Sequence, residues 1–300
     1  MVSVNGYYRD LDIDSYIEFL NKQGLRGIDR IAVRIALALK ADFRNIILYG
    51  APADGKSTIA TYTLDYIKQQ YGIDWISYNV DEATTSYNLF GGFDPSALVA
   101  GERRIHYGVI TKALKEKKNV LLDELNRTDF KNISKLMGFL SAPYRLVLEE
   151  SGEVFEYPKW FVLFATMNIG DEGNFSLSRA FKRRFLIIKV KYTELELKEI
   201  LEPLCGKDNL LLEMCLELYK FTWQLAEEKL VLFGCGVGHL INFIKALKVF
   251  QEEISDYSIA LREAVDMTVK MQLVDENDIF TLQEVEKRFE QEFFRKYRAI

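Results

Sequence analysis

The sequence predicts an α/β fold, in which a five-stranded parallel sheet is covered by helices on both faces and is followed by an all-helical region. Two observations on the 300-residue chain support this prediction. Short apolar runs alternate with segments of helical spacing up to about residue 190, and helical spacing alone continues beyond it. In sheets of this kind the ligand binds at the carboxyl ends of the strands. We therefore expect the functional residues to follow directly on the strands.

The elements are expected in a definite order. Two helices, 13–22 and 27–39, precede the sheet, because apolar residues recur every three or four positions in both segments. The strands are expected at 46–49, 75–80, 120–122, 161–166 and 185–190. The helices between the strands are expected at 59–70, 105–116 and 133–140. The later helices are expected at 195–201, 210–229, 238–250, 257–271 and 282–298, with a short apolar piece at 230–233.

The change of pattern after Val190 predicts a domain boundary near Tyr192. Residues 1–192 would form the α/β core with its N-terminal helices. Residues 193–300 would form a helical lid.

A hairpin is expected inside the core, over 144–157. Two β-prone runs, 145–148 and 153–157, flank the dipeptide Ser151-Gly152. Ser-Gly is typical of turns, and two such runs around a turn predict antiparallel pairing.

Composition and charge limit the class of protein. Apolar residues make up 49% of the chain, which is typical of a globular rather than a disordered protein. The net charge of −5 argues against a generic binder of polyanions, although a ring can carry a basic pore inside an acidic exterior. The three cysteines lack the spacing of a metal site and the two histidines are too few for zinc, so we expect buried free thiols. No segment is predicted to span a membrane or to direct secretion, which favours a cytoplasmic location.

Gly50 to Ser57 match the phosphate-binding spacing Gly-x-x-x-x-Gly-Lys-Ser. An apolar run leads into this motif and a segment of helical spacing follows it, which is the strand–loop–helix context that the motif requires. The glycines let backbone N–H groups turn towards phosphate oxygens, and the start of a helix adds partial positive charge. Lys56 can reach the β- and γ-phosphates, and Ser57 is placed to bind Mg²⁺. The residues expected to contact the nucleotide are Gly50, Ala51, Pro52, Ala53, Asp54, Gly55, Lys56, Ser57 and Thr58.

A second motif, about seventy residues later, ends the expected third strand with two carboxylates, Asp123 and Glu124. In nucleotide hydrolases the first carboxylate holds the metal and the second polarises the attacking water. The alternative is a pair of solvated acids at a strand end, but the order and spacing of the two motifs favour the catalytic interpretation. Together they predict the αβα sandwich of a P-loop NTPase that uses Mg²⁺. The glycine loop does not separate ATP from GTP, because it binds phosphate.

Residues 28 to about 190 resemble the core of an AAA+ ATPase of the MoxR branch and of its dynein-related and McrB-type relatives. Leu122-Asp-Glu-Leu-Asn-Arg is similar to that branch's Leu-Asp-Glu-Ile-Asn-Arg. Four further segments resemble its motifs, at 88–95, 106–114, 164–168 and 172–185. Proteins of this family form hexameric rings that use ATP to remodel a partner. The resemblance therefore implies a homo-hexamer that binds ATP and Mg²⁺.

The resemblance also implies roles for individual residues. Asn168 would be the sensor-1 residue, which contacts the attacking water or the γ-phosphate. Arg184, with Arg183 as the alternative, would be the arginine finger that acts on the nucleotide of a neighbouring copy; a solvated charged patch is the competing interpretation. Asn126 and Arg127 would couple the subunits, or would form an ordinary surface loop.

Two inserted hairpins are implied, near 86–104 and at 144–157. The second would point into the pore or across the face of the ring, unless it is an ordinary surface hairpin. The chain departs from the family at the lid helix that usually begins Ser-Pro-Arg, because the corresponding segment is Gly236-Val-Gly-His-Leu. His239 would stand where the sensor-2 arginine is expected, and a neutral histidine cannot form a guanidinium fork on the phosphate. We therefore expect a weaker sensor-2 function, another basic residue in its place, or a histidine packed at the start of a helix.

Three functions are consistent with these features. The first is a MoxR-like AAA+ ATPase that hydrolyses ATP at the subunit interfaces of a ring and remodels a separate protein partner, such as a von Willebrand factor A-type protein. The second is a McrB-like nucleotide-driven motor acting on nucleic acid, which we favour less because no DNA-reading domain is recognisable. The third is a nucleotide-dependent assembly module that hydrolyses slowly or not at all; His239 supports it and Glu124 opposes it.

Overall fold

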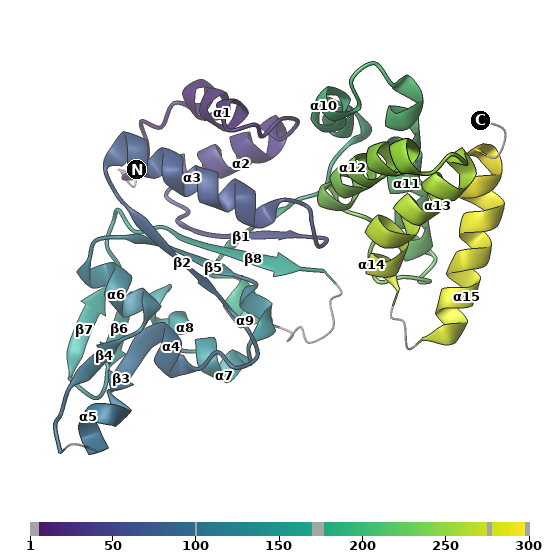
Figure 1. Ribbon diagram of the computed structural model, residues 1–300. Coiled ribbons are helices and arrows are strands. Elements are labelled where there is room, and N and C mark those ends of the chain that lie inside the picture. Colours follow the sequence, from purple (N-terminus) through teal and green to yellow (C-terminus); the bar gives the residue numbers. More distant parts are fainter. Residues whose placement is uncertain (1–5, 100, 170–176, 275–277, 298–300) are drawn as a thin grey trace.

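A five-stranded parallel sheet forms the centre of the core, and the C-terminal helices lie to one side of it (Figure 1). A computed structural model describes residues 6–99, 101–169, 177–274 and 278–297. The strand order in the sheet is β2-β5-β8-β1-β9, and every neighbouring pair is parallel. The strands are β1 (Asn45–Gly50), β2 (Trp75–Asn79), β5 (Asn119–Asp123), β8 (Leu163–Asn168) and β9 (Leu186–Lys189). The predicted fold class is confirmed, and each strand lies within two residues of its expected bounds at either end.

The three inner strands, β1, β5 and β8, are buried on both faces, which explains why they read as nearly continuous apolar runs. On β1, Ile46 and Leu48 belong to one buried cluster and Ile47 to another, because successive side chains point to opposite faces. The first face is covered by α1 (Ile13–Lys22), α2 (Asp29–Lys40) and α3 (Lys56–Tyr71). Shorter helices lie over the second face, namely α6 (Val109–Lys115), α7 (Phe130–Ile133), α8 (Leu136–Phe139) and α9 (Arg179–Lys182).

The predicted helix at 105–116 is wrong over its first residues. Ile105–Tyr107 forms strand β4, which pairs antiparallel with β3 (Gly91–Phe93), and α6 begins only at Val109. Gly91 permits this pairing, because it has a positive φ of 96° and a Cβ there would lie 2.1 Å from the carbonyl oxygen of His106. Helices α4 (Ser86–Phe90) and α5 (Pro95–Val99) flank β3, so the insertion near 86–104 is a hairpin with helical parts.

The predicted helix at 133–140 is also wrong as one element, because it is divided between α7 and α8. The hairpin predicted at 144–157 is confirmed: β6 (Arg145–Leu148) pairs antiparallel with β7 (Glu153–Glu156) around Ser151-Gly152. A 3₁₀ turn, η1 (Leu125–Arg127), follows β5.

Beyond Thr193 all the elements within the described residues are helical. They are α10 (Glu194–Cys205), α11 (Asn209–Glu227), α12 (Val237–Glu253), α13 (Tyr257–Val265), η2 (Asp266–Lys270), α14 (Met271–Leu273), α15 (Ile279–Arg288), η3 (Phe289–Phe293) and η4 (Phe294–Tyr297). Segments η2 and η3 are single π-helical turns and η4 is a 3₁₀ turn, so the two last predicted helices are interrupted. We call residues 194–297 the C-terminal helices; the domain boundary near Tyr192 stays a prediction.

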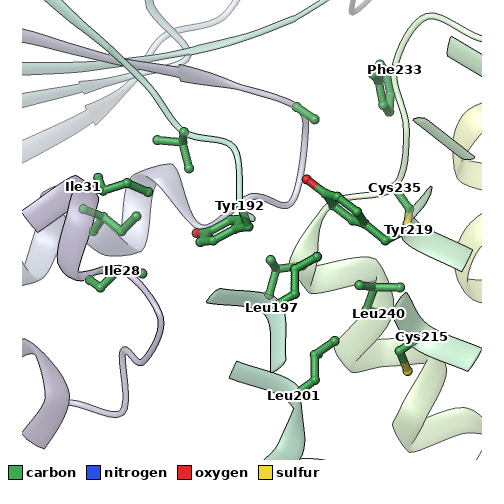
Figure 2. Close-up of a cluster of buried hydrophobic side chains, with 14 of the residues drawn as sticks. Ile28, Ile31, Tyr192, Leu197, Leu201, Cys215, Tyr219, Phe233, Cys235 and Leu240 are labelled. Atoms are coloured by element: carbon green, nitrogen blue, oxygen red, sulfur yellow. The ribbon is translucent and has the colours of Figure 1, made fainter. Parts of the chain in front are cut away.

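The C-terminal helices share one buried cluster with the core. Figure 2 shows Tyr192 between α2, which contributes Ile28 and Ile31 from its start, and Leu197 of α10. Tyr219 of α11 lies beyond, on the side of the C-terminal helices. All three cysteines are buried and free, as predicted. Within the described ranges, none of the helices is both long and apolar enough to cross a bilayer.

A buried hydrogen bond joins helix α1 to helix α3, and removing it tests how much this contact stabilises the fold. The hydroxyl of Tyr16 lies 2.6 Å from Oγ1 of Thr63, and Tyr16 is fully buried. We expect Tyr16→Phe to lower the free energy of unfolding by about 1 kcal/mol, because a buried hydrogen bond is lost while packing is kept. Chemical unfolding measures this value, and Tyr7→Phe at a 42% exposed tyrosine should change it by less than about 0.5 kcal/mol. Equal effects of the two substitutions would contradict the role of this bond.

Candidate functional site

The order of the strands brings three predicted functional segments to one edge of the sheet. Strand β8 lies between β1 and β5, so its carboxyl end is flanked by the glycine loop on one side and by the acidic pair on the other. In the register of the sheet Gly50 lies opposite Asn168. Leu122, just before the acidic pair, lies opposite Ala165. The sheet alone therefore places the acidic pair and Asn168 beside the phosphate-binding loop.

The glycine loop has the backbone expected for binding phosphate. Ala53 and Gly55 have positive φ values of 60° and 75°, and helix α3 begins directly afterwards at Lys56. Successive N–H groups at such a turn and at the start of a helix form a concave site for an anion. Pro52 is half-buried, and Ala53 and Thr58 are exposed.

Lys56 and Ser57 already contact partners within the site. Nζ of Lys56, which is buried, donates a hydrogen bond of 2.5 Å to the carbonyl oxygen of Ala51. Oγ of Ser57 donates a hydrogen bond of 2.7 Å to Oδ1 of Asp123. Lys56 has two further N–H donors for a bound phosphate, and Ser57 and Asp123 are already adjacent.

Thr166 joins the two acidic residues, and sequence reasoning missed it. Its hydroxyl donates a short hydrogen bond to Oδ1 of Asp123 and accepts the N–H of Glu124 at 2.9 Å. Thr166 is 1% exposed. A lone hydroxyl near the end of an apolar strand was the signal in the sequence that could have identified it.

Glu124 has an unusual backbone and two partners for its carboxylate. Its φ of 57° lies in the left-handed region, which is strained for a non-glycine residue and is a recurrent feature of functional sites. Oε1 accepts a hydrogen bond of 3.1 Å from Nδ2 of Asn168, and Oε2 lies 2.8 Å from Nε of Arg127. Asn126 donates from Nδ2 to the backbone carbonyl oxygen of Asn168 at 3.3 Å. The predicted sensor-1 residue and the predicted base are therefore in contact.

The residues placed to hold a magnesium ion suit its chemistry. Mg²⁺ prefers oxygen ligands and usually takes one or two from the protein, with water and phosphate oxygens completing its shell. The hydroxyl of Ser57 and the carboxylate of Asp123 supply such oxygens, and they lie together at the mouth of the loop. Asp123 is only half-buried, so space for further ligands is open to solvent.

The two arginines proposed as fingers lie near the amino ends of the strands, opposite to the glycine loop. They precede β9, and Asn45, at the start of β1, donates to the carbonyl oxygen of Arg184 at 3.2 Å. The guanidinium of Arg184 faces its own subunit: Nε donates to the carbonyl oxygen of Met137 at 3.0 Å and lies 3.1 Å from Oγ of Ser141. Its Nη1 also bonds to the carbonyl oxygen of Ala180. Arg183, in contrast, is exposed.

A cavity of about 700 Å³ at this edge is lined by both arginines and by Arg44, Ser141, Tyr144 and Tyr157. Residues 172–176, part of the run that resembles the family before these arginines, lie outside the described residues.

His239 is packed at the start of a helix and does not extend over the loop. Its Nδ1 accepts the N–H of Gly236 at 3.0 Å, so this nitrogen carries no proton. It is 8% exposed, and burial lowers its pKa. The geometry matches a histidine packed at the start of a helix, one of the three expectations for this position.

Asp54, inside the glycine loop, is buried where the loop contacts the C-terminal helices. It is 1% exposed, and its Oδ2 accepts the N–H of Ala51 at 3.1 Å. Burial raises the pKa of Asp54 to about 7, while the charge of Lys56 and the N–H of Val237 act in the opposite direction. Nothing in the sequence separates Asp54 from the other residues of the loop.

The core is similar to domains of known proteins. Residues 45–185 match the family model described as "AAA domain (dynein-related subfamily)". The chain is 30% identical to Midasin of Giardia intestinalis over 159 residues, which are 52% of this chain and 3% of Midasin. It is 25% identical to the uncharacterised protein SERP0979 of Staphylococcus epidermidis over 81% of this chain and 84% of that protein.

A third relative is the uncharacterised protein YojN of Bacillus subtilis, which is 29% identical over 61% of this chain and 59% of its own length. The chain thus spans a very small part of Midasin and less than two thirds of YojN. A crystal structure from Cytophaga hutchinsonii covers 95% of both chains with a TM-score of 0.47 and 16% identity, a resemblance too distant to indicate a function.

The pKa of Asp54 gives a prediction about stability and pH. A carboxyl whose pKa is raised on folding binds its proton more tightly in the folded state, so stability falls as the pH rises from about 4 to about 7. Asp54→Asn removes this loss and keeps an acceptor for the N–H of Ala51. We expect the variant to be more stable than the wild type by roughly 2–4 kcal/mol at pH 8, with a much smaller difference at pH 5. Chemical unfolding between pH 5 and pH 8 measures the difference, and Asp65→Asn on α3 is the control of equal charge. A difference that does not grow with pH would contradict this account.

Proposed function

We propose that this chain is a Mg²⁺-dependent ATPase that works as a ring and remodels a protein partner, because residues 45–185 match the model of the dynein-related AAA domain. One observation supports the proposal above all others. Glu124 lies within hydrogen-bonding distance of Asn168, beside the adjacent pair Ser57 and Asp123 at the mouth of the glycine loop. These are the groups that hydrolysis of a nucleoside triphosphate requires on the side of one subunit.

Each residue has a separate task in the proposed reaction. The N–H groups of the loop bind the β-phosphate, and Lys56 neutralises the β- and γ-phosphates. Ser57 and Asp123 hold Mg²⁺, which when bound neutralises charge on the phosphate oxygens. Glu124 accepts a proton from the attacking water, and Asn168 orients both Glu124 and the water.

Arg127 controls the base in this proposal. Its Nε lies 2.8 Å from Oε2 of Glu124, so Arg127 holds the orientation of this carboxylate. Movement of Arg127 would leave Oε2 of Glu124 available to the attacking water. The predicted role of Arg127 in coupling subunits would then act directly on catalysis.

The location of the arginines supports a ring. The glycine loop follows the carboxyl end of β1, whereas Arg183 and Arg184 lie near its amino end. A strand of six residues separates the two by roughly 15–20 Å, so neither arginine reaches the phosphates of its own subunit. A head-to-tail neighbour can supply the cation, and head-to-tail contacts that close form a ring. We propose Arg183 as the residue that does so, because Arg184 is bonded within its own subunit.

We propose a separate protein as the partner, and a von Willebrand factor A-type protein is the first candidate, from the resemblance to the MoxR branch. The net charge of −5 favours a protein over a nucleic acid. Stimulation of turnover by DNA, with steep dependence on salt, would favour the McrB-like motor instead.

The first test of this function is Glu124→Gln. We expect turnover of ATP to fall by about 10² or more, because the amide cannot accept the proton, while affinity for ATP stays within about threefold. Steady-state hydrolysis and titration with a fluorescent ATP analogue measure the two quantities. Glu116→Gln, at the end of α6 and away from the loop, serves as the control variant. Equal turnover of Glu124→Gln and wild type would remove Glu124 from catalysis.

The second test separates the two arginines. We expect Arg183→Ala to lower turnover about 10²–10³-fold without lowering the melting temperature, because its side chain is exposed. Arg184→Ala should instead lower the melting temperature, because it breaks bonds to Met137 and Ser141.

Mixing Arg183→Ala subunits with Lys56→Ala subunits tests whether the arginine acts between subunits. About a quarter of the interfaces in an equal, random mixture pair an intact loop with an intact arginine, so about a quarter of the activity should return. No recovery in a mixture that still assembles would contradict Arg183 as the cation of a neighbouring copy.

A further inference from the structure

The carboxylate of Asp54 lies between the phosphate-binding loop and the C-terminal helices. Oδ2 accepts the N–H of Ala51 within the loop. Oδ1 is buried without a hydrogen bond of ordinary geometry among the described residues, although the N–H of Val237 lies close enough to the carboxylate to act against the rise in its pKa. A Cβ on Gly236 would lie 2.9 Å from Oδ1. Gly236 is the residue before α12, so Oδ1 faces the first turn of that helix.

The loop and α12 are also joined through their backbones. The N–H of Gly238 donates to the carbonyl oxygen of Ala53 at 2.8 Å. The hydroxyl of Tyr192 donates to the carbonyl oxygen of Asp54 at 2.7 Å. A Cβ on Gly236 would lie 2.4 Å from the carbonyl oxygen of Pro52, so only a glycine permits this approach. Asp54 is therefore enclosed by α12 only while the C-terminal helices lie against the loop.

The charges around Asp54 change when a triphosphate binds. Among the described residues, Lys56 is the cation that lowers the pKa of Asp54 most, and Lys191 has a smaller effect. The other titratable groups at this junction are Tyr192, Tyr219 of α11, Cys235 and His239. A triphosphate in the loop attracts Lys56 and brings several negative charges close to the carboxylate. Both changes disfavour an ionised Asp54 beneath α12.

We propose that Asp54 is a positioning residue that links closure of the C-terminal helices to a proton: a charged carboxylate opposes closure, and closing on a bound triphosphate takes up one proton at this side chain. The inference rests on the proposed function, because it requires a triphosphate in the loop. Its chemistry is simple, since the proton comes from solvent and binds to the carboxylate, where Oδ1 has no hydrogen bond of ordinary geometry among the described residues. Binding of nucleotide would then depend on pH near neutrality.

Three measurements on the full chain test this proposal, with Asp54→Asn as the variant and Asp65→Asn as the control of equal charge. At pH 8 we expect Asp54→Asn to bind Mg²⁺-ATP about three- to tenfold more tightly than the wild type, because no proton has to be taken up. At pH 6 the difference between the two should be smaller, because the enclosed carboxyl, whose pKa is raised to about 7, takes up its proton more readily at the lower pH. Calorimetry in two buffers of different ionisation enthalpy should show greater proton uptake by the wild type than by the variant. Comparison with the variant removes the titration of ATP and of His239.

The third measurement needs no nucleotide. Hydrogen exchange of the amides of Val237 to His239 in the empty protein at pH 8 should be slower in Asp54→Asn than in the wild type, because α12 stays against the loop for longer. Equal exchange would overturn the proposal even if ATP is hydrolysed. Equal or weaker binding of Mg²⁺-ATP by the variant at pH 8 would overturn it as well. If the wild type bound no triphosphate at all, both the proposed function and this inference would be wrong. Slower amide exchange in Asp54→Asn than in the wild type would still support the contact between Asp54 and α12.

Discussion

The position of β8 between β1 and β5 is the constraint on which the site depends. It places Asn168 opposite Gly50 in the register of the sheet, and it allows one hydroxyl, from Thr166, to hold both Asp123 and the backbone of Glu124. Strands that are hydrogen-bonded in register cannot slide, because both faces of these three strands are buried. The spacing between the loop and the acidic pair is therefore set by the backbone, and side chains only complete it.

Each of three charged groups of the site lies against other parts of the same subunit. Lys56 bonds to the carbonyl oxygen of Ala51, Arg127 lies against Glu124, and Asp54 is enclosed beneath α12. Each of these groups has a different task in the proposed reaction, so binding of a nucleotide would change the charge around all three. Coupling of this kind gives a physical basis for linking the bound nucleotide to movement of the C-terminal helices.

The two ends of β1 carry complementary halves of the proposed active site. The anion-binding loop lies at one end, and the exposed side chain of Arg183 lies near the other. Complementary surfaces on opposite edges of one subunit suit a head-to-tail assembly, in which each interface contains one complete site. The same arrangement explains why Arg184 can be fully engaged in packing, since the bonds to Met137 and Ser141 hold the arginine segment in place.

The sequence by itself determined the fold class, the strands and the loop–helix motif, because alternating apolar runs and glycine spacing are local patterns. It also predicted roles for Lys56, Ser57, Asp123 and Glu124 from residue type and position after a strand, and these roles stay predictions. Only the tertiary structure showed that residues 105–107 pair as a strand with Gly91–Phe93, since pairing depends on a distant partner. The same holds for Thr166, for the inward orientation of Arg184 and for the burial of Asp54 beneath α12. Each of these depends on which segments meet in space, and such contacts produce no periodic pattern in the sequence.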